Sequence, residues 1–195
     1  ERLAGASLVA VDTETDSLDP LKARLVGVSL CTEDGEAWYL PCGHRDEAGE
    51  LVAGQLPLDR LIEFLRPVLE HPGTTKIGHN LKFDLAVLSA PCNGGIQLAC
   101  PLHDTMIGAW LLAPDRRTYK LDDLCGEIDL RMTSYEEVTH ADKSEDAFCR
   151  VPLEAAKNYS CEDVYGALRL YQEQLPQLER ADLLALLREV EGPLV

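Results

Sequence analysis

The sequence lacks the features that mark membrane, secreted or disulfide-rich proteins. It has no apolar run of about 18 residues, so no transmembrane helix is expected. The first five residues, Glu1–Gly5, contain no apolar segment typical of a signal peptide. The seven cysteines include no CxxC pair and are odd in number. This argues against a zinc site or a disulfide framework and favours buried free thiols in a reducing cytoplasm.

Positive charge is also scarce. The chain has 18 Lys and Arg against 34 Asp and Glu, which gives a formal net charge of −16. Nucleic-acid-binding proteins usually present a basic face to the phosphates, so the composition argues against tight duplex binding by this chain alone. Carboxylates that hold divalent metal ions count as negative in this sum, however, and a bound ion reverses the charge locally. A neighbouring basic domain would be a second source of attraction.

With 195 residues, 46% of them hydrophobic, the chain suits one compact domain with its own core. Apolar alternation predicts three early strands that form an antiparallel meander, at 8–11, 25–31 and 37–40. A loop at 43–56 and a helix that starts near Leu58 and ends at Pro72 precede a short strand at 74–78. Later helices are predicted at 80–88, 104–112, 121–124, 135–138, 153–175 and 178–190. This order indicates an α/β fold, a mixed sheet flanked by helices.

Asp12 and Glu14 form the first of three candidate functional motifs. They lie two residues apart at the end of an apolar strand, so period-two geometry places both side chains on one face. Two carboxylates so close repel each other unless a cation lies between them, and Mg²⁺ prefers oxygen ligands. Taken alone, the pair fits a polar exit from the strand into a turn better than a metal site.

The other two motifs pair residues four apart on predicted helices. Asn80 and Asp84 would face the same way, although Asn80 also suits a helix N-cap and Asp84 a favourable first-turn charge. Tyr159 and Asp163 would share a face of the long helix, where they could hold a water and a metal ion. The alternative for this pair is a core tyrosine beside a solvated acid.

The three motifs are weak singly and specific in this order. Longer segments carry the same signal, and they read Val-Asp-Thr-Glu-Thr-Asp-Ser-Leu-Asp at 11–19, Lys-Ile-Gly-His-Asn-Leu-Lys-Phe-Asp at 76–84, His-Asp-Thr-Met at 103–106 and Tyr-Ser-Cys-Glu-Asp-Val at 159–164. Over essentially its whole length the chain resembles the 3′–5′ proofreading exonuclease domain of bacterial family A DNA polymerase I, a member of the DEDD superfamily, tyrosine subtype. Residues 191–195 resemble the stretch where the polymerase domain of that family begins.

The resemblance implies a ribonuclease H-like fold and a two-metal-ion 3′–5′ exonuclease that releases nucleoside 5′-monophosphates from single-stranded DNA 3′ ends. It implies two divalent ions, Mg²⁺ or Mn²⁺, held by Asp12, Glu14, Asp84 and Asp163. Tyr159, the fifth catalytic residue, would orient the attacking water. Substrate contacts are implied for Thr13, Leu18, Asn80 and Tyr135. Leu18 would pack against the terminal base, although it also suits a loop residue tucked into the core.

The resemblance also implies a context. Residues 1–190 would form the exonuclease domain and 191–195 the connection to a polymerase domain of the same polypeptide. The protein would act in the bacterial cytoplasm as a monomer with no membrane partner. Some positions depart from the family pattern or invite a second interpretation. His79 stands where relatives carry glutamine, and we interpret it as a histidine with satisfied hydrogen bonds. Asp104 is either a buttress of the site or a helix N-cap.

Arg116, Arg117 and Lys120 form the small basic cluster near the middle of the chain, and we interpret them as a solvated loop rather than as phosphate contacts. Two other functions remain open. One is a ribonuclease D-like exoribonuclease with the same carboxylates. The other is an inactive spacer that supports a polymerase domain. All four acids and the tyrosine are present here, which favours the active nuclease.

Overall fold

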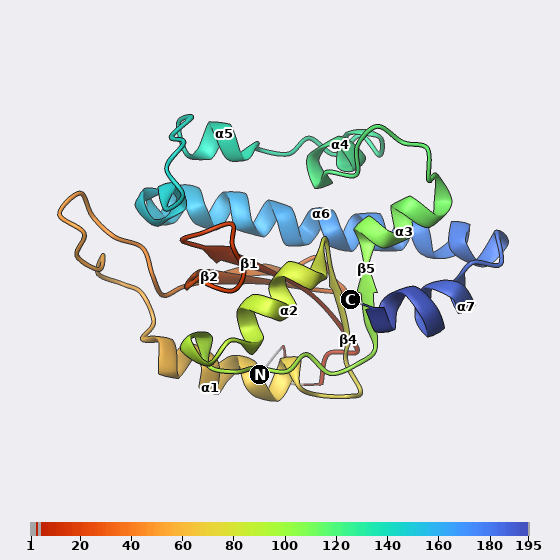
Figure 1. Cartoon of the computed structure of the whole chain (residues 1–195), viewed down its shortest axis with the longest axis horizontal. Coiled ribbons are helices and arrows are strands. Elements are labelled where there is room, and N and C mark those ends of the chain that lie inside the picture. The colour runs from red at the N-terminus through yellow and green to blue at the C-terminus, as the bar shows by residue number, and fades with distance from the viewer. Residues whose placement is uncertain (1–2, 4, 195) are drawn as a thin grey trace.

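A five-stranded mixed sheet with helices on both faces forms the protein in the computed structural model, which describes Leu3 and residues 5–194 (Figure 1). Glu1, Arg2, Ala4 and Val195 lie outside the described residues, and the predicted segments 1–190 and 191–195 both extend into them. The strands lie in the order β3-β2-β1-β4-β5. Their bounds are Leu8–Thr15 for β1, Leu25–Thr32 for β2, Ala37–Pro41 for β3, Thr75–Gly78 for β4 and Leu102–Asp104 for β5.

The first three strands pair antiparallel, whereas β4 pairs parallel with β1, and β5 pairs parallel with β4. The predicted mixed sheet with an antiparallel meander is therefore confirmed. The helices are α1 at Leu58–Leu69, α2 at Leu81–Ser89, α3 at Thr105–Leu112, α4 at Leu121–Gly126, α5 at Tyr135–Val138, α6 at Leu153–Arg180 and α7 at Leu184–Leu186.

The central strand β1 divides the core into two layers. Val9 and Val11 pack with α1 and α2 on one face, and Leu8 and Ala10 pack with α6 on the other. Successive side chains of a strand point to opposite faces, so the polar end of β1 continues both rows. Asp12 and Glu14 extend the row that faces α6, and Thr13 extends the row that faces α2. Figure 1 shows α6 running the length of the sheet.

Two sequence predictions at the C-terminal end of the chain were wrong. The helix predicted to end at residue 175 continues through Pro176 to Arg180, and the last helical segment, predicted for 178–190, begins only at Leu184 and runs to Glu191. A proline inside a helix removes one backbone hydrogen bond, but Leu178, two residues after Pro176, is fully buried, and its burial favours continuation of the helix. The chain then turns and forms α7, followed by a π-helical segment at Leu187–Glu191.

Strand β5 was missed by the sequence prediction, which placed the start of a helix near Asp104. Its three residues are too few to show alternation, and its pairing with β4 comes from tertiary structure. A smaller difference concerns α2, which begins at Leu81, with Asn80 in the N-cap position. Within the described residues, no helix combines the length and apolar character needed to cross a lipid bilayer.

Asn93 ties the connection between β1 and β2 to α2. Its side chain is buried, accepts a hydrogen bond from the Leu25 amide at 3.1 Å, and donates to the carbonyl oxygens of Ala23 and Val87, each at 2.9 Å. We predict that Asn93→Ala lowers the free energy of unfolding by about 3 kcal/mol, because three hydrogen bonds of about 1 kcal/mol each are lost. Urea denaturation measures this change. The matched control Asn158→Ala removes an exposed amide of α6 and should change stability little.

Candidate active site

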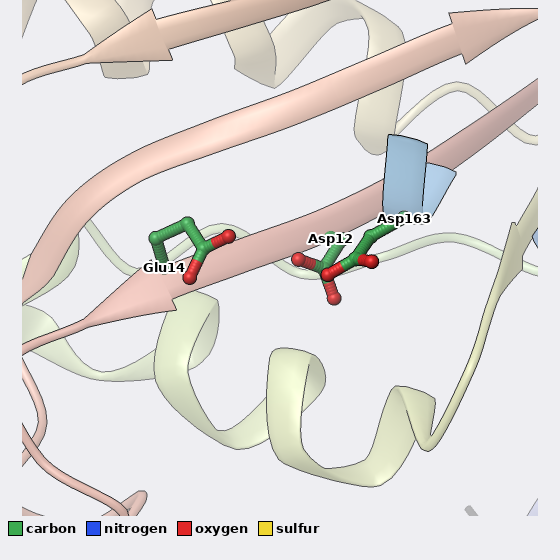
Figure 2. Close-up of side chains that lie close together, drawn as sticks. All are labelled: Asp12, Glu14 and Asp163. Atoms are coloured by element: carbon green, nitrogen blue, oxygen red, sulfur yellow. The ribbon is translucent and has the colours of Figure 1, made fainter. Parts of the chain in front are cut away.

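Three carboxylates meet where the end of β1 faces α6. One oxygen from each of Asp12, Glu14 and Asp163 lies within 4.8 Å of the other two. Glu14 is buried, and Asp12 and Asp163 are half-buried. Figure 2 shows Asp12 and Asp163 side by side, with the Glu14 carboxylate directed toward them from further along the strand. The predicted pairing of the first and third motifs is therefore present in the fold.

Ser160, a residue that the sequence analysis did not select, holds Glu14. Its hydroxyl is fully buried and donates to a carboxylate oxygen of Glu14 at 2.7 Å. Ser160 precedes Asp163 by three residues on α6, so both side chains lie on the same helical face. That i,i+3 spacing inside the third motif was the available sequence signal. One turn of α6 thus supplies both an acid and the hydroxyl that orients a second acid.

Asp84 approaches from α2 on the other side of β1. Its carboxylate accepts hydrogen bonds from the backbone amide of Thr13 at 2.9 Å and from the Thr13 hydroxyl at 2.6 Å. Both residues are buried. The Thr13 side chain is thus bonded to Asp84, a predicted cation ligand, and its predicted contact with substrate stays a prediction.

Asp104 fixes the start of α2, on which Asp84 lies. Its carboxylate accepts from the backbone amides of Asn80 and Leu81 at 3.0 and 2.8 Å, and it also caps α3 by accepting from the Met106 amide. The two interpretations of Asp104, a buttress and an N-cap, therefore both hold. Asn80 adopts a left-handed conformation with φ 66°, which turns the chain from β4 into α2.

The burial of these acids costs electrostatic free energy. Burial raises the pKa of Asp12 to about 7. Burial, and secondarily the charge of Asp12, raises the pKa values of Glu14, Asp84 and Asp163 well above their usual range. Among the described residues, no lysine or arginine forms an ion pair with any of the four. Closely spaced hard oxygen donors without a basic partner fit a divalent cation such as Mg²⁺ or Mn²⁺.

A pocket of about 580 Å³ opens over this cluster. Asp12, Asp163 and Tyr159 line it, together with the predicted substrate residues Asn80 and Tyr135. Burial raises the pKa of Tyr159 well above its ordinary value, so its hydroxyl stays protonated at neutral pH. Leu18 does not line this pocket. It lies on the connection between β1 and β2 with 83% of its surface exposed, so the interpretation of Leu18 as a core residue was wrong.

Phe148 packs behind the two tyrosines that line the pocket, Tyr135 and Tyr159. The sequence analysis also missed this residue. Tyr135 is 41% exposed and stacks on Phe148 with ring centroids 6.3 Å apart. Phe148 in turn contacts Tyr159 at 5.7 Å. An exposed ring supported by a buried one is suited to stack against a nucleobase, and it connects the pocket wall to the tyrosine of the third motif.

The histidine and the basic residues behave largely as the sequence indicated. His79 contacts the hydroxyl of Thr105 at 2.9 Å and the carbonyl oxygen of Tyr119 at 2.7 Å, so both ring nitrogens have partners. Arg116 forms an ion pair with Glu127 and is therefore engaged away from the pocket. Lys120 is exposed and lines the pocket.

Comparison with known proteins agrees with this geometry. A family model described as 3′–5′ exonuclease matches residues 1–179. The chain belongs to this exonuclease family. DNA polymerase I of Pseudomonas aeruginosa is 34% identical over 200 residues, which cover all of this chain and 21% of that protein. DNA polymerase I of Chloroflexus aurantiacus is 32% identical over 195 residues, again the whole chain and 20% of that protein. The chain thus spans about a fifth of the length of these relatives.

Solved structures place the fold among nucleases. Brucella melitensis NrnC superposes with a TM-score of 0.70 and 27% identity, over 95% of this chain and 80% of NrnC. Escherichia coli RNase D, an exoribonuclease, superposes with a TM-score of 0.69 over 96% of this chain and 44% of RNase D, at 18% identity. The predicted ribonuclease H-like fold is confirmed. The nuclease assignment rests on the family and the polymerase relatives, because the RNase D likeness shows the fold alone.

The raised acid pKa values predict an unusual dependence of stability on pH. Burial raises the pKa of Asp12 to about 7 in the folded chain, from an ordinary value of 3.8. Between these values the folded chain binds more protons than the unfolded chain, so the free energy of unfolding falls as pH rises. Without metal ions, we expect Asp12→Asn to stabilise the protein at pH 8 by roughly 2 to 4 kcal/mol and to change it little at pH 4.

Chemical denaturation in the presence of a chelator, repeated at several pH values, measures this difference. Added Mg²⁺ or Mn²⁺ should stabilise the wild-type chain more at pH 8 than at pH 6, because the cation and the protons compete for the same carboxylates. An Asp12→Asn curve parallel to the wild-type curve from pH 4 to pH 8 would rule out the electrostatic cost assigned to this residue.

Proposed function

We propose that this domain hydrolyses phosphodiester bonds at single-stranded DNA 3′ ends and serves as the proofreading module of a DNA polymerase I. The observation that carries the proposal is the convergence of Asp12, Glu14 and Asp163 beside Tyr159 at one pocket. An inactive spacer would have no need to bury acids whose mutual repulsion destabilises the fold. The complete set of four acids and the tyrosine therefore supports an active enzyme.

Each of these side chains has a role in the proposed reaction. Asp12 lies between the other acids and would contact two cations, with Glu14 and Asp163 on one and Asp84 on the other. Bound divalent cations supply Lewis acidity, which lowers the pKa of water and neutralises charge that develops on the leaving 3′ oxygen. Ser160 and Thr13 fix the orientations of Glu14 and Asp84. Tyr159, protonated at neutral pH, orients the attacking water, and a nucleoside 5′-monophosphate leaves.

The substrate would enter as a frayed single strand. Asn80 and Tyr135 line the pocket, and exposed Leu18 is available to pack against the terminal base. The polymerase domain of a longer polypeptide, joined after residue 190, would bind the duplex and deliver the strand end. This arrangement accounts for an exonuclease domain with a net charge of −16. We propose that the domain works as a monomer in the cytoplasm, with Mg²⁺ or Mn²⁺ as its cofactor.

RNA is the alternative substrate, and the fold supports it. NrnC, which resembles this chain over most of its length, has been solved bound to pGG, and RNase D is an exoribonuclease involved in structured RNA processing. The polymerase relatives favour DNA. Matched DNA and RNA oligonucleotides of one sequence, together with pGG, separate the two functions in a single assay. Faster cleavage of RNA or of pGG than of the DNA strand would favour the alternative.

We predict that the wild-type chain shortens a 5′-labelled single-stranded DNA stepwise from its 3′ end with Mg²⁺ or Mn²⁺, and leaves it intact with a chelator. Asp84→Ala should lower the rate by about 10²–10³-fold, because it removes one cation ligand from the transition state. A denaturing gel that resolves single nucleotides provides the measurement.

Asp84→Ala loses the two hydrogen bonds from Thr13 but also removes a buried charge that Asp12 repels. These two effects oppose each other, so the variant should unfold at a temperature near that of the wild type. Asp59→Ala, which removes an exposed acid of α1, is the matched control and should keep full activity. Wild-type turnover by Asp84→Ala would contradict the assignment of Asp84 to the site.

Tyr135 provides a separate prediction about substrate binding. Loss of one base-stacking contact costs about 1–3 kcal/mol, so Tyr135→Ala should raise KM for single-stranded DNA about tenfold and leave kcat nearly unchanged. Tyr135→Phe keeps the ring on Phe148 and should retain the wild-type KM. Steady-state kinetics with a short single-stranded oligonucleotide tests both variants. A kcat loss in Tyr135→Ala at constant KM would instead place this ring in the chemical step.

A further inference from the structure

Gly27 leaves an opening beside Glu14. The two residues are direct partners in the antiparallel β1–β2 pairing, and side chains at such positions normally lie about 4.5–5.5 Å apart. Gly27 contributes no side chain, and the Tyr39 ring of β3 occupies the space instead. A Cβ atom built on Gly27 would lie 2.2 Å from the Tyr39 hydroxyl oxygen and 2.4 Å from two of its ring carbons. The phenol therefore reaches across β2 to the side of Glu14.

His44 holds the hydroxyl group of Tyr39 in place. The Tyr39 hydroxyl and His44 Nε2 are 2.6 Å apart, and the exposed fractions of the two residues are 8% and 1%. The His44 ring packs against Phe148 with centroids 5.8 Å apart. Burial lowers the pKa of His44 to about 4, so this contact joins two neutral groups at neutral pH. The phenol is held at a fixed place, with little freedom to swing out of the glycine gap.

Glu14 is thus confined from two sides. On the side of α6 the Ser160 hydroxyl donates to it at 2.7 Å, and on the side of β2 the Tyr39 phenol closes the gap over Gly27. The charge of Glu14 in turn helps to raise the pKa of Tyr39, after the larger effect of burial. A glutamate side chain has three rotatable bonds, and confinement before a cation arrives lowers the entropy lost when it binds.

We propose that Tyr39, anchored by His44 in the opening above Gly27, is a positioning residue that holds the Glu14 carboxylate in place to bind a divalent cation. The inference rests on the proposed function, which makes Glu14 a cation ligand. Residues that orient ligands typically change metal affinity or activity by about 10–100-fold when altered. Tyr39 would act through Glu14 and would not touch the substrate.

Calorimetric titration of Mn²⁺ into the full chain tests this role directly. Tyr39→Phe removes the hydroxyl that His44 anchors, and it should weaken Mn²⁺ binding about tenfold. In the exonuclease assay, the Mn²⁺ concentration that gives half-maximal rate should rise by a similar factor, while KM for DNA stays at the wild-type value. Tyr171→Phe is the matched control: this half-buried tyrosine lies further along α6 against His103, and its variant should bind Mn²⁺ like the wild type.

Gly27→Ala provides a second variant with Tyr39 unchanged. The added methyl group would collide with the phenol and displace it from Glu14. It should reproduce the weaker Mn²⁺ binding. Thermal unfolding in a chelator shows how far each variant is folded. If Tyr39→Phe and Gly27→Ala lower the unfolding temperature yet bind Mn²⁺ with wild-type affinity, Tyr39 serves only the packing of β3, and the inference is overturned.

Glu14→Gln separates the failure of this inference from the failure of the proposed function. Weak Mn²⁺ binding by Glu14→Gln with wild-type binding by Tyr39→Phe overturns the positioning role and leaves the function intact. Wild-type Mn²⁺ binding by Glu14→Gln overturns the cation role of Glu14, and the inference falls with it. Weakened binding by Glu14→Gln, Tyr39→Phe and Gly27→Ala, with an unchanged Tyr171→Phe control, is the outcome that supports it.

Discussion

Repulsion among buried carboxylates is the constraint on which the rest of this structure depends. Four acids lie around the end of β1, and burial raises the pKa of each. Hydrogen bonds from Ser160 and Thr13 stabilise two of them but leave the like charges facing one another. The scaffold must therefore hold these acids together against their own repulsion. It does so with core residues that pack on both faces of the same strand, Val9 and Val11 toward α1 and α2, Ala10 toward α6.

The two-residue period of β1 distributes the acids between two helices. Asp12 and Glu14 face α6, while the intervening Thr13 faces α2 and binds Asp84. A one-residue slip of β1 against its neighbours would turn every one of these side chains to the wrong face. The parallel pairing with β4 and the antiparallel pairing with β2 fix that register from both sides. The position of α6 along the sheet then decides whether Asp163 reaches Asp12, and Val164, Ala167 and Leu168 of α6 fix that position by packing against β1.

The local sequence pattern was enough to predict those pairs of site residues that lie on one face of a single strand or helix. The two-residue spacing of Asp12 and Glu14 indicates one face of a strand, and the four-residue spacing of Tyr159 and Asp163 indicates one face of a helix. Both pairs lie at one site. Contacts between different elements were not predicted, although the i,i+3 spacing of Ser160 and Asp163 was visible in the sequence. The bond from Ser160 to Glu14 joins residues 146 positions apart, and the packing of Tyr39 over Gly27 depends on how β3 lies beside β2. Strand β5 and the passage of α6 through Pro176 escaped prediction for the same reason, since tertiary contacts decide both. Pairing with β4 forms β5, and burial of Leu178 favours continuation of α6.

The acidic composition of the chain is reflected in the lining of the pocket, where basic side chains are scarce. Arg116 forms an ion pair with Glu127. Of the described residues that line the pocket beside Asp12 and Asp163, Lys120 is the one lysine or arginine. A phosphate that approaches the pocket therefore meets mainly negative charge until cations are present, since a bound ion reverses the local field. Weak binding of DNA by the domain alone would suit the proposed role in proofreading. An exonuclease that gripped DNA ends tightly would remove correctly paired nucleotides as they frayed, whereas one that depends on delivery cleaves only the ends brought to it.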